Sequence, residues 1–109
     1  MSRSLREQAH ELTVEVYRAS AGFPEPDLAE RVRRAFGAVE LALREGADVA
    51  NGKLAAAGYL LLLSRDLGYL TASRWRALRD RVVDVGKKLR ARAFGSKAGP
   101  GRRSSLKRA

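Results

Sequence analysis

Apolar residues recur along most of the chain with alternating spacings of three and four, which is the period of an amphipathic α-helix. The first stripe comprises Leu5, Ala9, Leu12, Val16, Ala19 and Phe23. Gly22 is placed to end this helix in a left-handed cap, and Pro24 and Pro26 prevent its continuation. No segment alternates with period two, so the pattern predicts an all-α fold without a sheet.

The second predicted helix begins at Asp27, which can cap its N-terminus while Glu30 reaches back as in a capping box. Its apolar stripe is formed by Leu28, Val32, Ala35, Val39 and Ala42, widened by Phe36 and Leu43. Gly46 and the Asn51-Gly52 pair mark the next break. The third helix is therefore predicted over about residues 53–67.

Turn and cap residues also mark the boundary between the third and fourth helices. Gly68 supplies a C-terminal cap for the third helix, and Thr71 caps the fourth. Leu70 and Trp75 have the spacing of a hydrophobic staple, which fixes the direction in which the chain enters a helix. The fourth stripe consists of Trp75, Leu78, Val82, Val85 and Leu89.

The short breaks between these segments predict how the helices are arranged. Short loops join antiparallel neighbours, so residues 1–94 are expected to form an up-down-up-down four-helix bundle. Residues 95–109 are rich in Gly, Ser, Lys and Arg and contain too little apolar surface to fold alone. We predict a flexible basic tail there.

The third helix has more apolar surface than a single bundle requires. Its segment LAAAGYLLLL places apolar side chains at every angle around the axis, whereas a surface helix needs one apolar stripe. Either it is the most buried helix of a monomer, or one of its faces meets another subunit. Because each helix of a small bundle keeps a solvent face, we favour a homo-oligomer. The candidate interface residues are Leu54, Tyr59, Leu61 and Leu62.

Positive charge is concentrated at the C-terminal end of the chain. The net charge is +10, yet residues 1–85 contain 13 basic and 12 acidic residues, and residues 86–109 contain nine basic residues and no acid. Such a block is typical of proteins that bind polyanions. On the fourth helix, Arg74, Arg81, Lys88 and Arg92 fall within about 40° of one another at 3.6 residues per turn.

These charges define a candidate nucleic-acid interface, to which a cluster on the second helix is added. The candidate contacts are Arg31, Arg33, Arg34, Arg74, Arg81, Lys87, Lys88, Arg90, Arg92, Lys97, Arg102, Arg103, Lys107 and Arg108. Lys and Arg contacts to phosphate provide affinity without reading the base sequence. A disordered solubilising tail is the simplest alternative for residues 95–109.

The remaining composition argues against an enzyme. His10 is the only histidine and there is no cysteine, so no metal site, cofactor site or nucleophile–base pair is expected. The longest uncharged apolar run, Leu54 to Leu63, is too short to span a bilayer. The N-terminus also lacks the apolar core of a signal peptide. We expect a soluble cytoplasmic protein that does not associate with membranes.

Three segments resemble a family of small bacterial four-helix-bundle proteins: HELTVEVYRASAGFPEPDL, RVRRA and SRDLGYLTASRWRALRDRVVDVGKKL. One branch of the family is encoded by intervening sequences of large-subunit ribosomal RNA genes. The other contains the accessory variability determinant (Avd) of diversity-generating retroelements. The resemblance covers about residues 8–93, and neither branch is known as catalytic.

The two branches imply different functions. The continuous middle segment FGAVELALREGADVANGKLAAAGYLLLL and the basic C-terminus look more like the retroelement branch, whereas residues 5–23 look more like the ribosomal branch. The retroelement branch implies a pentamer that binds a reverse transcriptase and its template RNA and supports mutagenic cDNA synthesis. The alternative is a ribosomal intervening-sequence protein that acts as a protein–protein adaptor.

Overall fold

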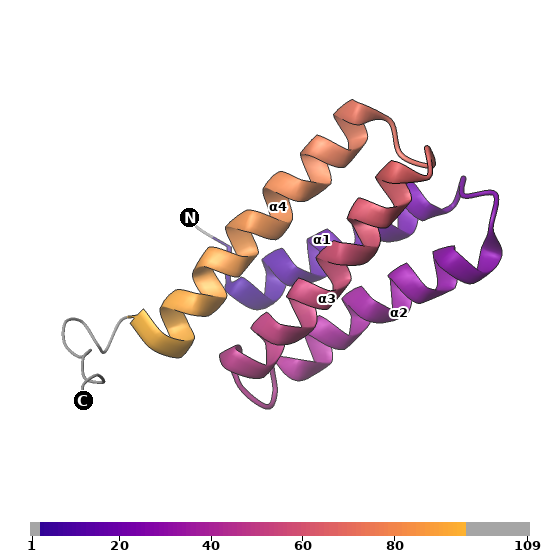
Figure 1. The fold of residues 1–109 in the computed structure, drawn as a ribbon. Helices are drawn as coiled ribbons and strands as arrows, with labels where there is room; N and C mark the ends of the chain where they lie inside the picture. The colour runs from indigo at the N-terminus through magenta and orange to yellow at the C-terminus, as the bar shows by residue number, and fades with distance from the viewer. Residues whose placement is uncertain (1–2, 96–109) are drawn as a thin grey trace, which may run out of the picture.

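The computed structural model describes residues 3–95 and contains the four predicted helices. They are α1 (Leu5–Ser20), α2 (Pro26–Ala42), α3 (Ala47–Asp66) and α4 (Ala72–Arg90), and a short π-helical turn, Ala91–Gly95, follows α4 (Figure 1). The described residues include no β-strand. The expected flexible tail falls almost entirely outside the described residues.

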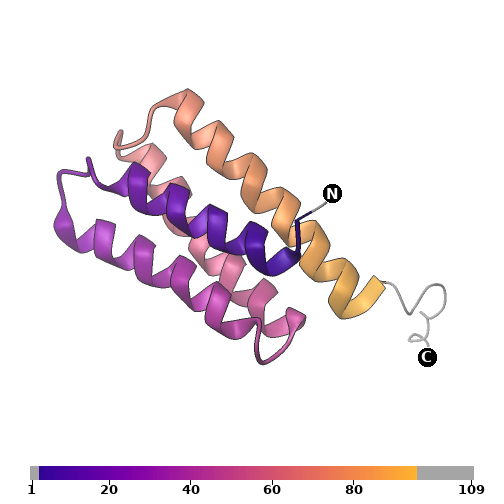
Figure 2. The same ribbon diagram turned by 180° about the vertical axis from the view of Figure 1, so that it is seen from behind.

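Each helix packs against two others in a closed arrangement. Helix α1 contacts α2 and α4, and α3 also contacts α2 and α4. Consecutive helices run in opposite directions, so the start of α1 and the end of α4 lie at the same end of the molecule (Figures 1 and 2). The predicted up-down-up-down four-helix bundle is therefore confirmed.

The core between the helices is formed by the predicted stripes. Its most completely buried large side chains are Phe36, Leu12, Leu89, Val16 and Val32. The buried hydroxyl of Ser64 donates to the Leu60 carbonyl at 2.8 Å, and that of Thr13 donates to the Ala9 carbonyl at 3.1 Å. Both polar groups are thereby satisfied within their own helices, which lets them join an apolar core.

The ends of α1 and the start of α2 differ from the sequence prediction. Ser4 forms a capping box with Glu7 at the start of α1. At its other end Ala21 is right-handed, and Gly22 does not have the positive φ predicted for it, because ordinary turn hydrogen bonds close this end. Helix α2 begins at Pro26, with Glu25 rather than Asp27 at the N-cap. Proline suits the first helical position because its φ is already helical and that position needs no N–H donor.

Helix α3 begins at Ala47, earlier than the predicted Lys53, and Asn51 and Gly52 lie inside it. Its buried stripe is Ala50, Leu54, Ala57, Leu61 and Ser64, with spacings of four and three. A glycine inside a helix costs about 1 kcal/mol relative to alanine. Burial of Ala50 at the start of this stripe offsets that cost, so packing decides where the helix begins.

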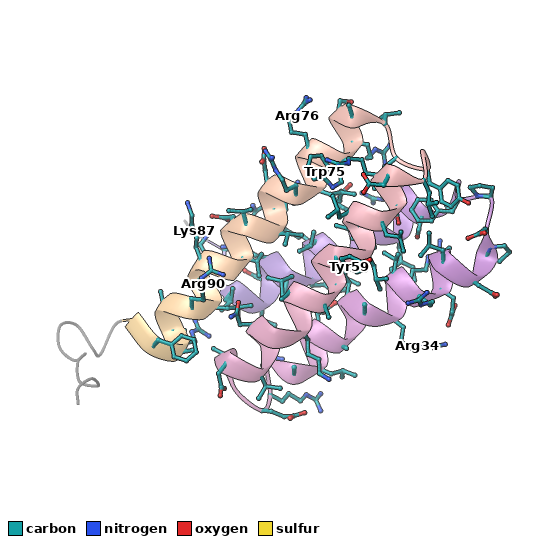
Figure 3. All side chains as sticks on the ribbon, viewed as in Figure 1. Arg34, Tyr59, Trp75, Arg76, Lys87 and Arg90 are labelled. Atoms are coloured by element: carbon teal, nitrogen blue, oxygen red, sulfur yellow. The ribbon has the colours of Figure 1, made fainter. Side chains whose placement is uncertain are left out.

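The buried stripe of α3 also revises the predicted subunit interface. Leu54 and Leu61 are only 3% and 2% exposed within the single chain, so their assignment to an oligomer interface was wrong. They complete the core against neighbouring helices instead. Leu62 is partly buried on the side of α3 that faces α4, where it lines a cleft. Tyr59 is 61% exposed and is the only one of the four on the outer face (Figure 3).

The turn between α3 and α4 follows the predicted capping pattern. Gly68 has φ +83°, its N–H donates to the Arg65 carbonyl, and the Tyr69 N–H donates to the Ser64 carbonyl. These two bonds form a Schellman motif. The Thr71 hydroxyl accepts the Arg74 N–H at 3.1 Å and caps α4. This turn sets the antiparallel direction of α4 on the bundle.

The two glycines that were predicted as left-handed caps should therefore respond differently to mutation. Gly68→Ala should lower the free energy of unfolding by about 1–2 kcal/mol, because left-handed backbone is disfavoured for residues with a Cβ. Gly22→Ala should change it by less than about 0.5 kcal/mol, since a Cβ at Gly22 meets nothing within 4 Å and the φ there is not positive. Urea denaturation of both variants measures the difference. Equal effects would contradict the assigned turn.

Candidate nucleic-acid interface

The positive charge of the folded part is concentrated on one helix. Helix α4 has seven Lys or Arg residues and two Asp residues, a net charge of +5, and Arg92 follows in the π-helical turn. Residues 3–71 contain nine basic and ten acidic residues, a net charge of −1. The rest of the bundle is thus almost neutral, and α4 with its C-terminal turn accounts for the entire positive excess of residues 3–95.

Most cations of α4 and its following turn lack an acidic partner, whereas four of the nine cations in residues 3–71 have one. Six cations of the described residues have an acidic partner: Arg3 with Glu11, Arg18 with Glu15, Arg34 with Glu30, Arg65 with Asp66, Arg79 with Asp80 and Lys88 with Asp84. Six cations of α4 and its following turn have no acidic oxygen of residues 3–95 within 4.0 Å: Arg74, Arg76, Arg81, Lys87, Arg90 and Arg92. All six are exposed. Their charges are therefore available to an anionic partner.

These unpaired cations lie on more than one side of α4. Arg76 and Lys87 project away from the bundle along its outer edge (Figure 3). They are separated by three helical turns, roughly 16 Å along the axis. Arg81 lies on the side facing α1, where it lines a cleft of about 250 Å³ whose other polar residues are Arg3, Gln8, Glu11 and Asp84. The arrangement is a cationic helix surface, suited to following a phosphate backbone.

Lys88 has a different environment from the one its position in the predicted basic stripe implied. Its Nζ donates to Asp84 Oδ2 at 2.7 Å and to Gln8 Oε1 of α1 at 2.9 Å. The hydrogen bond from Lys88 lowers the pKa of Asp84 below its ordinary value. The bond therefore supports the fold near neutral pH and is lost as acid protonates Asp84. Lys88 links α4 to α1, and it is less free to contact phosphate than Arg81.

The predicted cluster on α2 separates into residues with different contacts. Arg33 donates to the Ser20 hydroxyl at 2.8 Å and to the Tyr17 carbonyl at 3.1 Å, and its guanidinium lies 4.8 Å from the centre of the Tyr17 ring. These contacts join α2 to α1, so Arg33 is less free to contact phosphate than its place in the predicted cluster implied. Arg31 and Arg34 instead border a shallow groove of about 360 Å³ between α2 and α3.

Two cations absent from the sequence prediction belong to these surfaces. Lys53 borders the same groove as Arg31 and Arg34, across a floor of Ala35, Ala38, Ala56 and Leu60. Arg76 shares the outer edge of α4 with Lys87 (Figure 3). The eleven-residue spacing of Arg76 and Lys87 is a helical repeat that the sequence already contained. The position of Lys53 beside Arg31 and Arg34 depends on how α3 packs against α2, which the sequence alone does not give.

Aromatic residues are distributed unevenly around these charges. The half-buried Trp75 ring lies between two guanidiniums, with Arg65 at 4.4 Å and Arg79 at 5.1 Å from its centre. Cation–π contacts therefore already use this ring. Tyr59 and Phe94 are exposed, at 61% and 56%. These two rings offer stacking surfaces that the sequence analysis did not identify, since it assigned Tyr59 to the candidate subunit interface.

The single histidine of the chain, His10, takes part in a contact between two helices. His10 Nδ1 lies 3.0 Å from Glu40 Oε2, which joins α1 to α2 at the surface. Among residues 3–95, no three His, Cys, Asp or Glu side chains are grouped closely enough to hold a metal ion. None of the helices in that range combines the length and apolarity needed to cross a membrane. The charged surface of α4 is the most distinctive chemical feature described.

Comparisons with known proteins identify no relative whose function could be assigned to this surface. No protein-family model matches the chain, and no curated protein or solved structure is significantly similar to it. The resemblance to the four-helix-bundle family therefore rests on the motif residues alone.

Proposed function

We propose that this protein is a non-catalytic, oligomeric nucleic-acid-binding accessory protein of a diversity-generating retroelement, acting in the cytoplasm. It binds the retroelement's reverse transcriptase and template RNA and supports mutagenic cDNA synthesis. The retroelement assignment rests on the motif resemblance. The nucleic-acid assignment rests on one observation above the others: six exposed cations without acidic partners gather on α4 and its following turn.

Phosphate contact is the chemistry that this surface supports best. Unpaired cations on both sides of α4 and its following turn can contact phosphates, and such contacts give affinity that falls steeply with salt. They carry no base-specific information. Base specificity is therefore assigned to the other components of the complex, and this chain contributes affinity and positioning.

Oligomerisation would use the outer face of α3. Lys53 and Arg65 are the only charges on α3 between Asp48 and Asp66, so the intervening surface is uncharged. Tyr59, Ala55 and Ala56 are exposed there. Small residues allow a second backbone to approach closely, and an exposed aromatic residue can act as the anchor. We propose a homo-oligomer built through this face, with the pentamer of the retroelement branch as the expected form.

Deleting residues 96–109 tests whether the tail adds to the α4 surface. The deletion removes Lys97, Arg102, Arg103, Lys107 and Arg108, five charges. Each phosphate contact contributes roughly 0.7 to the log–log salt slope on single strands and about 0.9 on duplex DNA. The slope should therefore fall by up to about 3.5 to 4.5, while thermal stability remains unchanged because the helices are intact. Fluorescence anisotropy with labelled RNA at several salt concentrations provides the measurement.

The intact protein serves as the reference for this experiment. If it shows no salt-sensitive affinity for RNA or DNA at low ionic strength, the proposed function is wrong. If it binds but the deletion leaves the slope unchanged, the tail is not part of the interface and α4 provides the contacts alone.

A further inference from the structure

A cleft between α3 and α4 has a form suited to another protein. It has a volume of about 210 Å³ and is lined by Gly58, Leu61, Leu62, Trp75, Arg79 and Val82. Pockets for small molecules and cofactors usually measure roughly 300–1,000 Å³. This cleft is smaller than that range and matches a single large apolar side chain. It lies where the C-terminal part of α3 meets the N-terminal part of α4, beside Trp75 (Figure 3).

The charges around the cleft are arranged asymmetrically. The α3 wall has no charged residue from Leu54 to Ser64. On the α4 wall, Arg79 uses only one of its nitrogens, Nη2, to contact Asp80 at 3.0 Å. A guanidinium has five N–H donors, so Arg79 can donate hydrogen bonds to a second carboxylate. One wall is thus apolar and the other cationic.

Arg90 extends the cationic wall along the same side of α4. A Cβ placed on Gly86 would lie 3.1 Å from Arg90 Nη1 and 3.5 Å from Leu54 Cδ2. The guanidinium therefore folds back over Gly86 toward α3. Arg90 has no acidic partner among residues 3–95. Arg79 and Arg90 are eleven residues apart, which places them roughly 16 Å apart along the axis.

We propose that this cleft is a docking site for an acidic amphipathic helix of a partner protein. One large apolar side chain of the partner enters the cleft beside Trp75, and its apolar stripe continues along the side of α3 that faces α4. Acidic residues along one edge of that stripe, about three turns apart, pair with Arg79 and Arg90. This is the helix-in-groove mode of recognition, with the charge on a single flank fixing the orientation. The inference does not depend on nucleic-acid binding.

Two glycines of α3 provide a matched pair of variants. A Cβ at Gly58 would make ordinary contact with Val82 Cγ1 at 3.7 Å and would occupy part of the cleft, whereas a Cβ at Gly52 meets nothing within 4 Å. Both lie inside α3, where Ala is preferred over Gly. Gly58→Ala and Gly52→Ala should therefore both remain folded, and only the first should narrow the cleft.

The test uses a fluorescein-labelled synthetic helical peptide with leucines at i, i+4, i+7 and i+11 and glutamates along one flank. A second peptide has lysines in place of the glutamates. The full-length protein should bind the acidic peptide and not the lysine peptide, with a change in the emission of Trp75, the single tryptophan. Gly58→Ala should weaken binding about tenfold, as expected for overfilling a packed site, and Gly52→Ala should not. Arg79→Gln with Arg90→Gln should weaken binding and flatten its salt dependence.

Several results would overturn the proposal. If the two peptides bind equally well, or if Gly58→Ala and Gly52→Ala bind the acidic peptide with equal affinity, the cleft is not the site for an acidic helix. If a single-stranded RNA oligonucleotide changes Trp75 emission and Gly58→Ala weakens RNA binding, the cleft holds nucleic acid instead. If Gly58→Ala lowers the oligomer mass measured by light scattering, the occupant is a second copy of this chain.

Discussion

Leu61→Glu should unfold the protein, whereas Tyr59→Glu should leave the bundle folded. The two residues are two positions apart on α3, yet Leu61 is 2% exposed and Tyr59 is 61% exposed. Placing a carboxylate at Leu61 buries an unpaired charge and removes a core side chain, changes that belong to the most damaging class of substitutions, above about 4 kcal/mol. Circular dichroism with thermal denaturation measures both variants.

A third variant, Leu61→Ala, separates the effect of burying a charge from the effect of losing the leucine side chain. Leu61→Ala should cost about 2–5 kcal/mol, the range for leaving a cavity in a packed core. If Leu61→Glu remains as stable as the unmodified protein, the register of α3 is wrong. Tyr59→Glu has a further use, because light scattering of this folded variant tests the proposed oligomer. A mass equal to that of the unmodified oligomer would place the subunit interface elsewhere.

Sequence periodicity determined the core more reliably than the ends of the helices. Leu12, Val32 and Leu89 were predicted in apolar stripes and are buried, because burial of an apolar face is what the helical period encodes. The caps were less certain, because several polar or glycine residues near a boundary can serve. Asn51 and Gly52 looked like a break, yet they lie within α3 since the Ala50 side chain begins the buried stripe.

The sequence predicted most of the basic residues that the candidate site contains, but it did not predict which of them form contacts within the fold. The sequence predicted a basic stripe on the fourth helix, and α4 has a net charge of +5. Pairing could not be read from the sequence, because it depends on which residues the fold brings together. Lys88 contacts Gln8, 80 positions away, and Arg33 turns toward Ser20 on another helix. Only the packed bundle distinguishes these anchored cations from unpaired ones such as Arg76.

Neutralising the unpaired cations should reduce RNA affinity far more than neutralising the ion-paired ones. Changing the six unpaired cations of α4 and its turn to glutamine should weaken RNA binding at low ionic strength by at least about 100-fold. Those six are Arg74, Arg76, Arg81, Lys87, Arg90 and Arg92. The salt slope on single-stranded RNA should fall by up to about 4, because each lost phosphate contact removes roughly 0.7.

The six ion-paired cations provide a control with the same change in net charge. They are Arg3, Arg18, Arg34, Arg65, Arg79 and Lys88, and each is neutralised to glutamine in the control protein. Exposed ion pairs contribute little to stability, so both proteins should remain folded, which circular dichroism verifies. If binding follows the position of the unpaired charges, the control protein should lose much less affinity and slope. If both proteins lose the same affinity, RNA responds only to net charge, and the six unpaired cations are not preferred contacts.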